Sequence, residues 1–108
     1  MAKQISVKAV KSTGSSLSSM YKEAQTYLMN IGFSKMPLLA LTSKEQTFRS
    51  YIFSQGREKV ILEYKQDEYE EVLNLVFNET EIRFVYDILL MRFNQLARDE
   101  KSVFIYNE

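Results

Sequence analysis

The sequence predicts one α+β domain, spanning residues 1–108, in which two helices pack on a mostly antiparallel sheet. Two segments, 17–31 and 80–98, repeat apolar residues at helical spacing. The segments around them alternate apolar and polar residues or cluster β-branched and aromatic ones, as strands do. Because 45% of the 108 residues are hydrophobic, the chain can build one core. The expected order is strand, helix, strand, meander, helix and strand.

The first strand is predicted over residues 4–10, where apolar and polar residues alternate. After a serine-rich turn comes the first helix, 17–31, with apolar residues on one face: Leu17, Met20, Tyr21, Ala24, Tyr27, Leu28 and Ile31. Ser15 or Ser16 can cap its first N–H groups. Past its end, Gly32 can adopt the left-handed conformation, so that Phe33 folds back toward the helix.

The middle of the chain is predicted to form a meander. Pro37 favours extended backbone at Met36, the residue before it, and residues 38–42 fit a short strand. Residues 47–54 and 59–64 fit a hairpin around Gly56.

Two registers of this hairpin fit the sequence. One places Arg49 opposite Glu63. The other slips by one residue and brings Tyr51 and Phe53 to the core face. The two registers differ in which side chains the sheet buries.

Residues 66–77 fit two structures. As a helix capped by Asp67, they carry an apolar stripe; as a strand, they alternate apolar and polar residues. The upstream hairpin and the Val and Phe residues near the end favour a third strand of the meander.

The second helix, 80–98, is apolar nearly all round between Ile82 and Phe93, where nine of twelve residues are apolar. A surface helix needs an apolar stripe only about 100° wide. The helix is therefore either sandwiched within the domain or part of an interface with another chain. The residues outside its main face are the candidate interface: Phe84, Ile88, Leu90 and Met91. The closing strand, 103–106, is apolar on both faces, which predicts cover on both sides.

Histidine and cysteine are both absent from the sequence. The usual imidazole base, histidine-assisted nucleophiles and thiolate metal sites are therefore excluded. We expect no catalytic residues, no cofactor and no bound metal, and hence no enzyme. No apolar run approaches the ~20 residues of a membrane span, and no signal peptide is recognisable. We expect a cytoplasmic protein.

Charge is unevenly distributed, although the net charge is zero. Residues 1–62 carry nine Lys and Arg against three Glu, and residues 63–108 carry five against eleven Asp and Glu. Intermixing of the two halves in one sheet is favoured over a bipolar surface. The basic half also supplies a candidate nucleic-acid surface, in which rings and cations interleave: Lys3, Lys8, Lys11, Arg49, Tyr51, Arg57 and Lys59.

The sequence favours a non-catalytic protein-binding or regulatory module. An inhibitor, an immunity or anti-defence factor, and a small chaperone all fit; the partner is another protein or a second copy in a homodimer. A nucleic-acid binder is the alternative, and a small enzyme independent of His and Cys a distant third. The order of helix, meander and long helix is loosely similar to that of type III secretion chaperones, and the resemblance implies a small dimeric binding protein.

Overall fold

The computed structural model describes residues 3–10, 17–43, 46–78, 83–98 and 103–107. They form an α+β domain with a six-stranded antiparallel sheet and two helices, as predicted. The elements are β1 (Lys3–Val10), α1 (Ser18–Asn30), β2 (Ser34–Thr42), β3 (Thr47–Gln55), β4 (Glu58–Gln66), β5 (Glu70–Phe77), α2 (Arg83–Ala97) and β6 (Val103–Asn107).

The sheet has the strand order β2-β3-β4-β5-β1-β6. A meander runs from β2 to β5, and β1 is inserted between β5 and β6. The basic and acidic halves of the sequence are therefore interleaved. Ion pairs between described residues join them, such as those of Lys8 of β1 with Glu70 of β5 and of Arg92 of α2 with Glu23 of α1.

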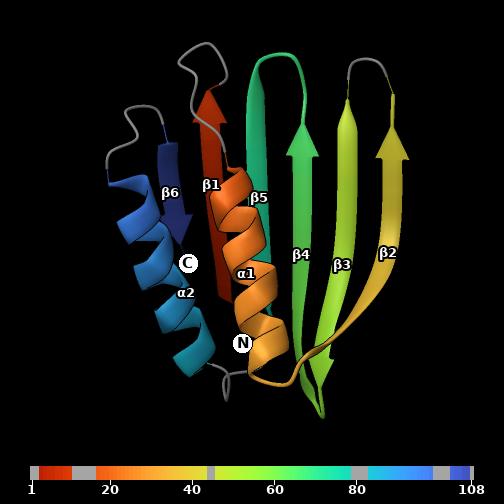
Figure 1. The fold of residues 1–108 in the computed structure, drawn as a ribbon, viewed down its shortest axis with the longest axis vertical. Coiled ribbons are helices and arrows are strands. Elements are labelled where there is room, and N and C mark those ends of the chain that lie inside the picture. The colour runs from red at the N-terminus through yellow and green to blue at the C-terminus, as the bar shows by residue number, and fades with distance from the viewer. Residues whose placement is uncertain (1–2, 11–16, 44–45, 79–82, 99–102, 108) are drawn as a thin grey trace.

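Both helices lie on one face of the sheet, which we call the helix face (Figure 1). They cover the part of the sheet nearer β6, whereas β2 and β3 have no helix in front of them (Figure 1). The core lies between, and its sheet side consists of alternate residues that are at most 1% exposed: Ile5, Val7, Ala9, Phe53, Val60, Leu62, Leu73, Leu75 and Phe77. We call the opposite side of the sheet the open face.

The C-terminus of α1 has the predicted geometry. Gly32 has a φ of 107°, and the Phe33 N–H donates to the Leu28 carbonyl over 3.0 Å. The Gly32 N–H donates to Met29, so that both hydrogen bonds of a Schellman motif are present. Phe33 is thereby turned into the core, where 4% of it is exposed.

The N-terminus of α1 is described from Leu17 onward. Leu17 takes the N-cap position and makes no side-chain capping bond. The expected caps, Ser15 and Ser16, lie outside the described residues.

The β3–β4 hairpin adopts the slipped register. Arg49 lies opposite Tyr64 rather than Glu63. Phe53 is fully buried on the helix face, and Tyr51 packs against the core beside it. The first register is wrong because it would turn these aromatic rings away from the helices.

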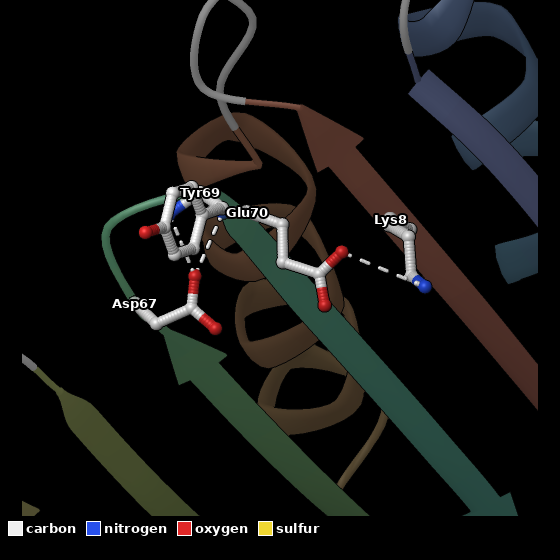
Figure 2. Close-up of polar contacts among 4 residues, drawn as sticks. All are labelled: Lys8, Asp67, Tyr69 and Glu70. Carbon is white, nitrogen blue, oxygen red and sulfur yellow. Dashed lines mark hydrogen bonds and ion pairs between the residues drawn. The ribbon is translucent and has the colours of Figure 1, made fainter.

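Residues 66–77 form a strand for most of their length, and the helical alternative is wrong. Asp67 instead closes the β4–β5 turn, where its carboxylate accepts hydrogen bonds from the N–H groups of Tyr69, over 2.8 Å, and Glu70, over 2.9 Å (Figure 2). Glu70 then points along the open face to Lys8, 3.5 Å away (Figure 2). Asp67 thus bonds within the turn, as the first residue of an Asx turn does.

The second helix and the last strand are covered on one side only. In α2, Val85, Tyr86, Leu89 and Phe93 face the core, whereas Met91 is 53% exposed. In β6, Val103 and Ile105 pack on the core, but Phe104 and Tyr106 are 47% and 58% exposed. The expectation that this strand is covered on both faces is wrong, because the helices occupy only one side.

The hairpin register can be tested with two phenylalanines of β3 that point to opposite faces. We expect Phe53→Ala to lower the free energy of unfolding by ~3–5 kcal/mol, since it empties a fully buried site. Phe48→Ala, at a half-buried site on the open face, should cost less than half as much. Urea unfolding followed by circular dichroism measures both. Equal losses, or a larger loss for Phe48→Ala, would contradict the register.

Candidate protein-binding edge

The strand β2 forms one edge of the sheet, and all nine of its residues are exposed. It pairs with β3 on one side only, and the register shifts by a bulge between Pro37 and Leu39. Large apolar side chains on an edge normally find cover, yet four here are exposed: Met36 (61%), Leu38 (53%), Leu39 (47%) and Leu41 (59%). We call these four residues the β2 patch.

The open face continues the β2 patch across the sheet. Met36 lies opposite Ile52 of β3, and this row continues through Ile61 of β4 to Val76 of β5. Leu41 lies opposite Phe48, and the two line a hollow of about 330 Å³ with Thr42, Ser43 and Gln46. The apolar surface therefore extends from the edge onto the open face.

Toward β1 the open face becomes polar. The Ser6 hydroxyl donates to the Asn74 side-chain oxygen over 2.6 Å, and Gln4 donates to Ser6 over 3.1 Å. These polar residues separate the apolar surface that continues from β2 from the exposed Phe104 and Tyr106 of β6, which lie beyond β1 on the same face.

The β2 edge is also nearly free of charge. Lys35 is the one charged residue of β2, and its ammonium group lies 4.3 Å from the centroid of the Tyr51 ring. Sheet edges are commonly protected from pairing by lysine, proline or a bulge. In β2 these devices, Lys35, Pro37 and the bulge, all lie in the first half of the strand. The second half, up to Thr42, has none.

A polar cluster lies beside this surface, between α1 and the helix face. At its centre is Glu71 of β5, which is 6% exposed. Its carboxylate oxygen Oε2 accepts hydrogen bonds from the Tyr64 hydroxyl, over 2.7 Å, and from the Leu17 N–H, over 3.3 Å. Glu71 therefore binds a free N–H group at the start of α1 and places a negative charge at the positive end of the helix dipole.

Two tyrosines of this cluster hold their protons tightly. Burial, followed by a hydrogen bond with Tyr51, raises the pKa of Tyr21 to about 12, and Arg49 opposes this shift. Burial and the bond to Glu71 raise the pKa of Tyr64 above its ordinary value as well. The two rings are in contact, with centroids 5.0 Å apart. At neutral pH both hydroxyls are therefore hydrogen-bond donors rather than bases.

Arg49 is the cation of this polar cluster and lies opposite Tyr64 in the sheet. It lines a hollow of about 280 Å³ together with Ser18, Tyr21, Thr47, Tyr64 and Gln66. The lining is polar and contains no carboxylate; the nearby buried carboxylate of Glu71 is bonded to Tyr64 and Leu17. Within the described residues, no group of three or more Asp and Glu side chains could hold a metal ion.

The structure divides the predicted nucleic-acid residues between the two faces of the sheet. Lys3, Arg49 and Tyr51 share the helix-face positions of their strands, and Lys3 lies 4.8 Å from the Tyr86 ring centroid. Lys8 and Lys59 occupy positions of the open face, and Lys8 is paired with Glu70.

Of the remaining two predicted residues, Arg57 lies in the β3–β4 turn and Lys11 is outside the described residues. The six described residues are therefore spread over both faces of the sheet and a turn.

The predicted interface on α2 is only partly exposed. Ile88 and Leu90 are half-buried, Met91 is exposed, and the side chain of Phe84 lies outside the described residues. The larger unpaired surface is β2, which the sequence interpretation missed. Its signal was an apolar run without alternation that contains a proline, because proline within a sheet is confined to edges and bulges.

No family model and no curated protein matches this chain. Among the described helices, none is long and apolar enough to cross a membrane.

The contribution of Glu71 can be measured against its neighbour in β5. We expect Glu71→Ala to lower the free energy of unfolding by ~3 kcal/mol, because it leaves the Tyr64 hydroxyl and the Leu17 N–H without this acceptor. Glu70→Ala removes an exposed ion pair and should cost at most ~1 kcal/mol. Chemical unfolding at pH 7 compares them, and equal losses would contradict the role of Glu71.

The raised tyrosine pKa values predict a loss of stability in alkali. A group whose pKa is higher in the folded state stabilises the fold fully below its unfolded pKa, here about 10. This contribution is lost as the pH rises toward 12, the folded pKa of Tyr21. We expect the double variant Tyr21→Phe/Tyr64→Phe to lose less stability than the wild type between pH 9 and pH 11.5. Tyr69→Phe, at a residue that is 76% exposed, is the control and should follow the wild type. If the free energy of unfolding fell in parallel with pH for all three proteins, the raised pKa values of Tyr21 and Tyr64 would be contradicted.

Proposed function

We propose that this protein is a non-catalytic protein-binding module that receives an extended segment of a protein partner along β2. The observation that carries the proposal is a nine-residue edge strand that is exposed throughout and bears the β2 patch. An added strand would pair with the free N–H and C=O groups of this edge, while its side chains cover the leucines.

The chemistry of the edge indicates the kind of segment that fits. Between Met36 and Thr42 the strand carries no charge, and the apolar row on the open face continues from it. A segment in β conformation with apolar residues on one face matches this surface. Inhibitors, immunity factors and small chaperones can all use this mode of binding.

The absence of His and Cys from the sequence supports a binding role over a catalytic one. The polar cluster adds to this support, because its tyrosines stay protonated at neutral pH and its carboxylate is bonded to α1. The nucleic-acid alternative has less support, since the proposed cations lie on two faces of the sheet.

The proposal can be tested by selecting displayed random nonapeptides on the immobilised protein. We expect the enriched peptides to alternate apolar and polar residues. Measured by fluorescence anisotropy, they should bind Leu39→Lys/Leu41→Lys at least ~10-fold more weakly than the wild type, because two charges then face the added strand. Met91→Lys, which places a lysine on an equally exposed site of α2, should bind like the wild type.

Two results would overturn the proposal. One is the failure of the protein to enrich any peptide at a concentration at which it is monomeric, and the other is equal binding to the wild type and the β2 variant. Tight binding of single-stranded RNA at low salt, unaffected by the β2 variant, would favour the nucleic-acid alternative.

A further inference from the structure

We infer that the partner of β2 is a second copy of this chain, paired antiparallel about a two-fold axis at Ala40. The inference rests on the proposed function, because it names the occupant of the same edge. It is carried by the geometry of β2, by the chemistry of the resulting pairs and by the position of its one charge.

The geometry of β2 limits where a partner strand can pair. Pro37 has no N–H group, and the bulge lies between Pro37 and Leu39. From Leu39, opposite Ser50, the register with β3 is regular as far as Thr42. The regular outer edge is therefore Leu39–Thr42. In an antiparallel pair of identical strands the two-fold axis places one residue opposite its own copy, and an axis at Ala40 sets the two leucines of this segment opposite each other.

This register matches apolar side chains across the junction. Leu39 lies opposite Leu41 of the second copy, and Leu41 lies opposite its Leu39. Both residues are on the open face, where Leu41 also neighbours Phe48. Because the axis is perpendicular to the sheet, the open faces of the two copies lie on the same side. The four leucines then form one cluster, and cross-strand apolar pairs of this kind stabilise a sheet.

The charges of β2 are compatible with pairing to itself. The strand has no carboxylate, and its one cation, Lys35, lies near the N-terminal end. With the axis at Ala40, the two copies of Lys35 are ~33 Å apart along the strands, at about 3.3 Å per residue. This exceeds the Debye length of about 8 Å in physiological salt, so the lysines do not repel each other appreciably.

Pairing of β2 with itself also gives a closed assembly. The other edge strand, β6, has five residues. Pairing of β2 with β6 of the next copy would leave one free edge at each end and would add copies without limit. A two-fold pair covers β2, the longer and more apolar edge, in both copies. It leaves no free β2 edge for a third copy.

The chain lacks cysteine, so single cysteine variants give a clean cross-linking test. Directly opposed residues of an antiparallel pair have Cα atoms about 4.5–5.5 Å apart, which is within the range of a disulfide. We expect Ala40→Cys to form a disulfide-linked dimer under mild oxidation. Lys35→Cys on the same strand and Met91→Cys on α2 should remain monomeric on a non-reducing gel.

Light scattering after size-exclusion chromatography completes the test. The wild type should have twice the mass of the chain, and Leu39→Lys/Leu41→Lys should dissociate at concentrations at least ~10-fold higher than the wild type does. The variant should keep the circular dichroism spectrum of the wild type, because both leucines are exposed.

Three results would overturn the inference: a wild type that is monomeric at high concentration, cross-linking of Met91→Cys in place of Ala40→Cys, or cross-linking of Lys35→Cys alone. A monomer that nevertheless binds the selected peptides would leave the proposed function standing and exclude only the second copy. A monomer that binds none of them would exclude both.

Discussion

The structure depends on one constraint: the six-stranded sheet is wider than the layer of two helices that packs on it. Strands lie about 4.8 Å apart, so six strands place the two edges ~24 Å from each other. Two helices, each about 10 Å across, cover ~20 Å and cannot reach both edges. They lie toward β6 (Figure 1), and the burial of the helix face follows them. Alternate residues of β1, β5 and β4 are fully buried, β3 contributes Phe53 alone, and β2 contributes nothing. The exposure of β2 is thus a consequence of the architecture.

Glu71 shows how the covered part of the sheet is fixed to the first helix. A carboxylate that is 6% exposed is costly unless it is bonded, and here it is bonded by groups from two other elements. The N-cap residue Leu17 makes no side-chain capping bond, and the long-range bond from Glu71 satisfies its N–H group in place of a local cap. It also determines where the helix begins relative to β4 and β5, because the Tyr64 hydroxyl and the Leu17 N–H meet at one oxygen atom.

Local chemistry was enough to predict much of this fold from sequence. The Schellman motif at Gly32 and the alternation in β1 involve residues close together in the chain, and both are found in the structure. The register of β3 and the cover of β6 depend on which face the helices occupy, and no local pattern contains that information. The same limit explains the binding surface. The apolar residues of α2 drew attention because they were numerous, yet most of the described ones face the core. Those of β2 were fewer, and their exposure follows only from the place of β2 in the sheet.

The position of β1 has a consequence for how the protein folds. The meander from β2 to β5 joins neighbours in sequence, whereas β1 pairs residues as distant as Lys3 with Phe77 and Ile5 with Asn107. Pairings of high contact order form late, because the entropy of closing a long loop must be lost before they contribute. Until β1 docks, β5 is itself a free edge, and its core residues Leu73 and Leu75 lack their partners on that side, Val7 and Ile5. The folding chain therefore passes through a stage in which the edge of β5, a central strand of the final sheet, is unpaired, and such exposed edges favour aggregation.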